Sequence, residues 1–142
     1  MTGSSCVFVA APAYSARAIA EEILALLGTP SSKIAMAQFY SAATEAPDFK
    51  IPPTTDYHGY APEQGFPAWV RVGVLDEWYR AQVLADFEGS QVIREAMFGA
   101  THLARLNYSY GGGIEATVHS AITSLAARYP LRWLDDHGTL HW

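Results

Sequence analysis

The chain has 142 residues, half of them hydrophobic, so it is long enough to bury the core of one domain and is not a disordered segment. Its formal net charge of −5 argues against a nucleic-acid-binding protein, which needs a basic face. No apolar run approaches the roughly 20 residues that span a bilayer, and the start lacks a basic signal-peptide region, so we expect a cytoplasmic protein without membrane contact.

The first elements follow from an apolar run and a helical spacing. Residues 6–11 (CVFVAA) predict a short buried strand. This strand contains Cys6, the only cysteine, so neither an intrachain disulfide nor a cysteine-bound zinc site can form. Ser15 is placed to cap a helix that ends at Gly28. Residues 33–40 predict a second strand, which completes a strand–helix–strand unit.

Residues 41–67 differ from the rest of the chain because they contain five prolines and four aromatic residues. A segment of this length without regular structure is unusual in a compact domain and often has a function. Disordered linkers seldom contain so many aromatics, so we expect this loop to pack across the domain surface. The alternative is an insertion without a role.

The middle of the chain predicts three strands and a short helix. Residues 68–75 (AWVRVGVL) predict a strand and residues 81–88 (AQVLADFE) its hairpin partner, so DEWY between them would form a turn or a wide bulge. Ser90 is placed to cap a short helix. Residues 102–110 alternate between two faces and predict another strand.

The end of the chain predicts a helix and a hairpin. The helix covers residues 114–128, and the hairpin LRWLDDHGTLHW turns at residues 136–138. The apolar face of the helix would consist of Ile114, Val118, Ala121, Ile122 and Leu125. Residues 1–142 thus predict one α+β domain, in which a mostly antiparallel sheet of five to six strands carries two main helices on one face. A ferredoxin-like strand–helix–strand is one arrangement for its core.

Three glycines, residues 111–113, separate the last predicted strand from the helix. No lysine follows them, and their spacing fits neither a Walker loop nor a dinucleotide fingerprint. Glu115 in the first turn suits the positive helix end but would repel a phosphate there. We therefore expect a sharp corner. A third interpretation is that the loop lets a partner's backbone approach Tyr108 and Tyr110.

Neither a catalytic motif nor a metal-binding motif is recognised, and no cofactor is expected. His137 and His141 lie in the tail, but a spacing of four in a strand separates side chains by about 13 Å, too far for one ion. The DHG sequence is therefore predicted to form a turn. The other histidines lack any specific motif and are His58, His102 and His119.

The tetrapeptide EWYR is the most interface-like group, because Trp, Tyr and Arg are enriched among binding hot spots. The alternative is that Trp78 closes one end of the core. Trp69 and Trp133 lie in predicted strands and are expected in the core. The predicted partner-binding residues are Trp78, Tyr79, Arg80, Tyr108, Tyr110 and Gly112.

The chain closes with a strand, a helix, IEATVHSAITSLAARYP, and a strand pair, LRWLDDHGTLHW. With this module, the short, acidic and aromatic-rich chain resembles the small immunity proteins of bacterial polymorphic and secretion-system toxins. The resemblance covers about 40 residues. It implies a non-enzymatic protein that binds a cognate toxin one-to-one and blocks its active site. Acidic residues would steer it toward a toxin that is basic at the contact surface.

Two other functions stay open. A small enzyme or small-molecule-binding domain would place its site under the 41–67 loop and use His58, His102 or His119. A cleft that holds two of these histidines with a carboxylate would favour it. A homo-oligomeric subunit would bury the strand edge near Trp142 between copies.

Overall fold

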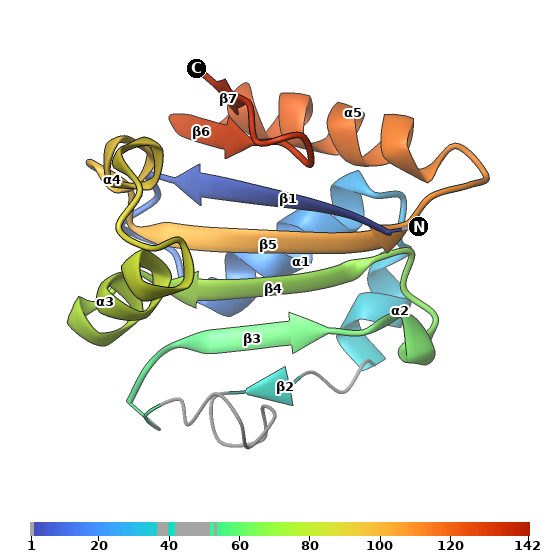
Figure 1. The fold of residues 1–142 in the computed structure, drawn as a ribbon. Coiled ribbons are helices and arrows are strands. Elements are labelled where there is room, and N and C mark those ends of the chain that lie inside the picture. Colours follow the sequence, from blue (N-terminus) through green and yellow to red (C-terminus); the bar gives the residue numbers. More distant parts are fainter. Residues whose placement is uncertain (1, 37–39, 42–51, 53) are drawn as a thin grey trace.

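In the computed structural model, the described residues are 2–36, 40–41, 52 and 54–142 (Figure 1). They form a seven-stranded sheet in the order β2-β3-β4-β5-β1-β6-β7, in which every neighbouring pair is antiparallel. The strands are β1 (Thr2–Val9), β2 (Tyr40–Ser41), β3 (Tyr57–Tyr60), β4 (Trp69–Val74), β5 (His102–Ser109), β6 (Leu131–Leu134) and β7 (Leu140–His141). The helices are α1 (Ala16–Leu26), α2 (Ser31–Met36), α3 (Glu77–Asp86), α4 (Gln91–Met97) and α5 (Ile114–Ala126), with a 3-10 turn at Pro62–Gln64.

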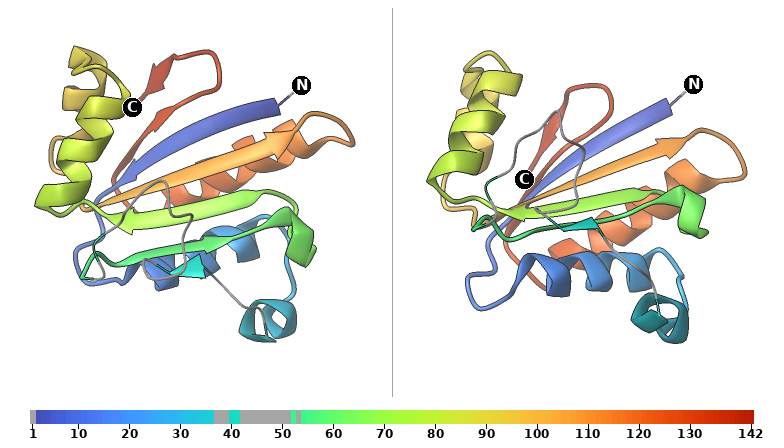
Figure 2. Two further views of the ribbon diagram at one scale, coloured as in Figure 1. Left: turned by 60° about the horizontal axis from the view of Figure 1, so that its bottom comes forward. Right: turned by 90° about the horizontal axis from the view of Figure 1, so that it is seen from below.

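The four central strands have ferredoxin-like connections. β1 leads through α1 to β4, and β5 leads through α5 to β6, while the strand order β4-β5-β1-β6 interleaves the two units. Both connecting helices lie on the same face of the sheet (Figure 2). The predicted α+β class, with an antiparallel sheet and two main helices on one face, is confirmed.

The face that carries α1 and α5, called the back face below, buries the larger core. Alternate residues of β5 point into it, as their period-two pattern predicts. The α5 side chains that the sequence assigns to an apolar face are buried there, except that Ile114 is only partly buried. α1 begins at Ser15, whose hydroxyl accepts a hydrogen bond from the Ala18 amide at 3.1 Å, as predicted.

The opposite face, called the front face, is covered by helices at one end only. α3 and α4 are inserted between β4 and β5 and pack on Phe8, Tyr57 and Leu103. In Figure 2, no helix of the described chain stands over the other end of this face, where β1 begins and β5 finishes. The chain therefore has two apolar cores, and one of them stops halfway along the sheet.

The predicted strand at residues 33–40 is wrong over its first half. Residues 31–36 form α2, and Tyr40, the last residue of the predicted strand, pairs with β3 together with Ser41, while residues 37–39 lie outside the described residues. Pro30 precedes α2, and its carbonyl accepts the Lys33 and Ile34 amides at 3.1 and 3.2 Å. A proline fits the first turn of a helix because no intrahelical partner is needed for its nitrogen. Pro30 therefore lies at the start of α2.

The predicted hairpin of residues 68–75 and 81–88 is also wrong, because the second half is helix α3. The expected turn DEWY is the start of this helix: the Asp76 carboxylate accepts the Tyr79 amide at 2.7 Å. Glu77 then lies in the first turn, where the helix dipole favours an acid. The predicted short helix after Ser90 exists as α4, although the Ser90 side chain makes no capping bond.

The 41–67 loop contains more regular structure than its prolines suggest. Residues 57–60 form β3, which pairs with β4, and the 3-10 turn follows. Tyr60 and Phe66 are buried in the back core, with ring centroids 5.3 Å apart. Phe49 and most of the first half lie outside the described residues. The expected packing of aromatic residues against the domain therefore holds for the described second half.

Candidate functional site

The six predicted partner-binding residues fall into two separate groups. Trp78, Tyr79 and Arg80 lie at the start of α3 on the front face, and Tyr79 packs over Gly73, which pairs with Leu103. The second group lies where β5 leads into α5. At about 3.4 Å per residue, the five steps along β5 from Leu103 to Tyr108 separate the groups by roughly 17 Å. Tyr108 also faces the back core, so the two groups do not form one surface.

Within the first group, the structure gives Arg80 a structural part. Its guanidinium donates to the carbonyls of Leu75 at 2.9 Å, Ala100 at 2.5 Å and Met97 at 3.3 Å. Tyr79 is buried, and burial raises the pKa of its hydroxyl, with the charge of Arg105 acting in the opposite direction. Trp78 is partly exposed and stacks on Tyr79. Of this group, Trp78 is the residue best placed to meet a partner.

Within the second group, the glycines form the sharp corner that the sequence predicts. Gly111, Gly112 and Gly113 have φ values of +125°, +62° and +78°, a run of left-handed conformations that other residues rarely adopt. Tyr108 is buried, and the Tyr110 hydroxyl donates to the Asp136 carboxylate. The exposed glycine corner is therefore the part of this group that a partner can reach.

A groove lies beside this corner, at the uncovered end of the sheet, and has a volume of about 500 Å³. We call it the sheet-end groove. It is lined by Thr2, Gly3, Ser4, Pro62, Pro67, Trp69, Asn107, Tyr108, Ser109, Gly111 and Ile114. Its floor comes from three adjacent strands, β4, β5 and β1, and is polar except for the aromatic rings.

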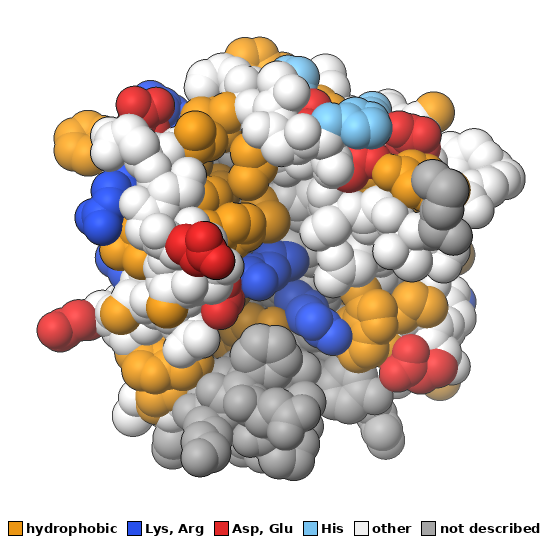
Figure 3. Space-filling model, viewed as in Figure 1, with side chains coloured by type: hydrophobic (Ala, Val, Ile, Leu, Met, Phe, Trp, Pro, Cys, Tyr) orange, Lys and Arg blue, Asp and Glu red, His pale blue; other side chains and the backbone are white. Residues whose placement is uncertain are grey.

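Two arginines on adjacent strands lie next to this groove. Arg71 of β4 is directly opposite Arg105 of β5 in the sheet register. Like charges in such a pair repel each other, so the pair is unfavourable unless other groups compensate. Basic side chains are visible at the centre of the front face, beside α3 (Figure 3). We call these two residues the arginine pair.

The groups around the arginine pair compensate it only in part. The Arg71 guanidinium lies over the Trp69 ring, 4.3 Å from its centroid, and Arg105 pairs with Asp86 at 3.3 Å. The Nε atoms of both arginines are buried without a hydrogen-bond partner among the described residues. Within the described part of the chain, two positive charges therefore face the carboxylate of Asp86 and retain unused donors, which is an arrangement that suits an anionic group.

The groove and the arginine pair form one continuous surface, which we call the front site. Trp69 joins them, because its ring lines the groove and also carries Arg71. Trp69 is therefore only partly buried, and its predicted place in the core is wrong, whereas Trp133 is buried as predicted. The front site was missed from the sequence, although the alternation of residues 102–110 already put Arg105 and Asn107 on one face.

The three histidines considered for an enzyme are bound to three different partners. His58 Nε2 lies 2.9 Å from Asp56 Oδ1, and His119 packs against the Trp133 ring at 4.8 Å. His102 is buried, with Nε2 2.9 Å from the Tyr14 carbonyl oxygen. β3 and β6 are four strand positions apart in the sheet, roughly 19 Å at the usual spacing, so His58 and His119 do not meet.

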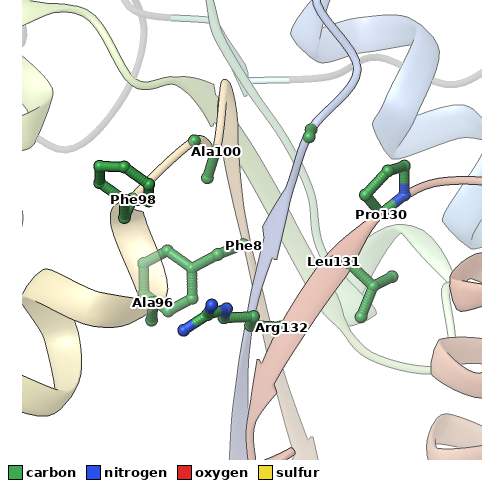
Figure 4. A pocket seen from close by; sticks show the side chains of 9 residues that line it. Phe8, Ala96, Phe98, Ala100, Pro130, Leu131 and Arg132 are labelled. Atoms are coloured by element: carbon green, nitrogen blue, oxygen red, sulfur yellow. The ribbon is translucent and has the colours of Figure 1, made fainter. Parts of the chain in front are cut away.

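Another hollow, of about 300 Å³, lies between α4 and β6 (Figure 4). Phe8 and Phe98 form much of its wall, and Phe98 is 86% exposed. Arg132 lines it as well and donates to the Glu95 carbonyl at 3.2 Å. This hollow offers apolar surface but brings together no group for acid–base or metal chemistry.

The chain matches no protein-family model, no curated protein and no solved structure. Across the described part of the chain, every helix is too short or too polar to cross a bilayer. Any assignment of function therefore depends on the chemistry of the chain's own residues.

Proposed function

We propose that this chain is a non-catalytic binding protein that holds an acidic segment of a partner protein at the front site, as an immunity or inhibitor protein holds its toxin. The observation that carries this proposal is the arginine pair, which is only partly neutralised and stands at the inner end of a groove. The resemblance of the closing helix and hairpin to immunity proteins supplies the class of partner, a cognate bacterial toxin.

Charge is the first argument for an acidic segment. A carboxylate that reaches Arg71 and Arg105 would accept hydrogen bonds from their guanidinium groups and reduce the repulsion between the two charges. A buried charge-assisted hydrogen bond contributes about 1.5–3 kcal/mol, more than an exposed ion pair. The front site should therefore bind most tightly a partner segment that has Asp or Glu at its tip.

Shape is the second argument. The sheet-end groove is open at the molecular edge and continues to the arginine pair, so a loop or an extended segment fits it better than a compact small molecule does. Trp69 and Trp78 flank the arginine pair on β4 and α3, and aromatic rings beside arginines are typical of binding hot spots. The glycine corner adds backbone that a partner can approach without meeting a side chain.

The proposed partner differs from the sequence-based expectation in one respect. The net charge of −5 predicts a toxin that is basic at the contact surface. The front site is locally positive, so the segment that enters it should be acidic, while basic residues of the same partner could meet the acidic surface around it. A toxin held in this way would have a loop near its active site withdrawn from its substrate.

Affinity capture from the source organism tests the proposal when a charge-reversed variant is included. Tagged wild-type protein should retain one partner in a one-to-one ratio, and Arg71→Glu should retain at least tenfold less of it. Arg71 is preferred to Arg105 because Arg105 also pairs with Asp86 at 3.3 Å, so its reversal would break an ion pair within the fold. A thermal unfolding curve establishes that the variant is folded.

Arg17→Glu is the matched control, because it makes the same charge change on α1, on the other side of the sheet. It should retain the partner as the wild type does. If Arg71→Glu and the wild type retain equal amounts, the front site is not the contact surface. If no partner is retained at all, the binding function itself is wrong, and the enzyme and self-assembly alternatives take its place.

A further inference from the structure

We infer that Glu115, His119 and Asp136 form a binding site for one divalent transition-metal ion, and that Zn²⁺ is the ion that fits them best. This site is separate from the front site and from the function proposed for it. One potential ligand atom from each residue lies within 4.8 Å of the other two. These separations need only small side-chain rotations to place three ligands around one ion at about 2.0–2.2 Å.

The fold brings the three ligands together from two elements. Glu115 and His119 are four residues apart in α5, so they project from the same side of the helix, one turn apart. Asp136 lies in the turn between β6 and β7, which follows α5 in the chain and passes beside it. The site therefore joins the start of α5 to the C-terminal hairpin.

Burial is the second observation, and it is independent of the distances. The Asp136 side chain is only 3% exposed, and its Oδ1 atom lies 3.8 Å from His137 Nε2 but has no hydrogen-bond partner among the described residues. The Nε2 atom of His119 is likewise buried without a partner there. A buried carboxylate oxygen and a buried ring nitrogen that remain unsatisfied are costly. A cation between them would satisfy both atoms.

The residues around the ligands hold them in place. The Tyr110 hydroxyl donates to the other carboxylate oxygen of Asp136, and this hydrogen bond raises the pKa of Tyr110 to about 12, so the hydroxyl remains a donor at neutral pH. The Trp133 ring packs against His119. Metal ligands are usually oriented by such neighbouring contacts, which fix a carboxylate or an imidazole before the ion arrives.

The hairpin turn that carries Asp136 is itself rigidly built. The Asp135 carboxylate accepts the His137 and Thr139 amides at 2.9 Å each and lies 2.8 Å from His141 Nε2. Although burial acts in the other direction, these bonds lower the pKa of Asp135. The ion would therefore bind to a preformed pair of elements and would not have to order them.

The ligand types select the ion. Two carboxylates supply two negative charges, which a divalent cation neutralises, and one imidazole favours Zn²⁺ over Mg²⁺ or Ca²⁺, which prefer oxygen ligands. Three protein ligands leave a fourth tetrahedral position for water or for a group of another molecule.

Titration calorimetry with ZnCl₂ tests the site, using tag-free protein that has been dialysed against a chelator. The wild type should bind one Zn²⁺ per chain. Asp136→Asn and His119→Gln should each weaken binding at least tenfold, and Tyr110→Phe, which leaves all three ligands in place, should weaken it less. Addition of Co²⁺ should give the visible absorption of a low-coordinate site, and this absorption should be lost in Asp136→Asn.

His58→Gln is the control for adventitious zinc, because His58 lies on β3, four strand positions from β6, and pairs with Asp56. It should change the affinity less than twofold. The proposal is overturned if the wild type shows no saturable one-to-one binding, or if His58→Gln weakens binding as much as the ligand variants. Should Asp136→Asn fail to fold, Glu115→Gln in the first turn of α5 decides the matter, since unchanged zinc affinity there would also overturn the site.

Discussion

The two faces of the sheet show how one strand can serve both stability and binding. On the back face, β5 contributes Ala104, Leu106 and Tyr108 to a core that α1 and α5 cover. On the front face, Leu103 is as deeply buried as Leu106, but Arg105 and Asn107, two and four residues further along, are only partly buried. The difference arises because α3 and α4 cover one end of the front face and leave the other end open.

The front site lies where α3 and α4 stop covering the front face of the sheet. The arginine pair lies beside the edge of α3, and the sheet-end groove lies beyond it. On the back face, Trp133 Nε1 donates to Ser5 Oγ at 3.2 Å and His102 binds the Tyr14 carbonyl, whereas His119 Nε2 on α5 has no hydrogen-bond partner among the described residues. The two faces therefore differ chiefly in that two arginines of adjacent strands lie at the end of the front face that α3 and α4 do not cover.

The largest effects should come from the two leucines that β5 buries on opposite faces. Leu106→Ala and Leu103→Ala should each lower the free energy of unfolding by about 2–5 kcal/mol, because both side chains are fully buried. Chemical denaturation measures both. If Leu103→Ala lowers the free energy of unfolding by less than about 1 kcal/mol, α3 and α4 do not form a packed layer, and the comparison of the two faces is wrong.

Arg80→Met should have the next largest effect and should lower the free energy of unfolding by about 2–3 kcal/mol, because it leaves up to three carbonyls without their charged donor. Arg80→Lys should recover part of the loss, since an ammonium group reaches fewer of these carbonyls than a guanidinium. The structure thereby separates Arg80 from partner binding. A variant that keeps wild-type stability but no longer retains the partner would restore the sequence-based assignment of Arg80 to the interface.

Alanine substitutions at two glycines that pack under aromatic rings compare the packing of the two faces directly. A Cβ atom at Gly73 would come closer than 3.0 Å to Tyr79 and Tyr57 on the front face, and one at Gly3 would come that close to Tyr108 on the back face. Each change to alanine should cost about 1–3 kcal/mol through overpacking. Gly73→Ala should be the more costly, because two rings must move instead of one. If chemical denaturation shows that Gly73→Ala lowers the free energy of unfolding no more than Gly3→Ala does, the front core accommodates an added methyl group more easily than its packing indicates.

Much of the back face was predictable, because its patterns are local. The cap at Ser15, the alternation in residues 102–110 and the apolar face of α5 each depend on residues close in sequence. α3 was not predictable from the same kind of pattern. Residues 81–88 alternate enough to suggest a strand, and the helix is decided by the Asp76 cap and by packing on the front face.

The candidate sites could be predicted less well than the fold, because each depends on a register or a tertiary contact. The arginine pair requires that β4 and β5 be adjacent with Arg71 opposite Arg105, and a wrong hairpin partner for β4 concealed this. For a metal site, the sequence pattern pointed only to the tail histidines, His137 and His141. Glu115 and His119, four apart in a predicted helix, were the available signal, but their partner Asp136 becomes visible only when the hairpin is placed beside α5.

The smallest expected effect is a pH dependence carried by His102 on the closed back face. Burial lowers the pKa of His102, against the opposing effects of its hydrogen bond to the Tyr14 carbonyl and of the Asp56 charge. The unfolded chain therefore takes up a proton near pH 6.5 before the folded chain does. The contribution of His102 to stability is complete above that pH and falls as the pH decreases toward the folded-state pKa.

The free energy of unfolding of His102→Gln, measured from pH 8 to pH 5, should be lower than that of the wild type at high pH and should decline less steeply. Parallel curves for wild type and His102→Gln would mean that the back face tolerates a charged His102, and the contrast between a closed face and an open one would then be weaker than the burial of this side chain indicates.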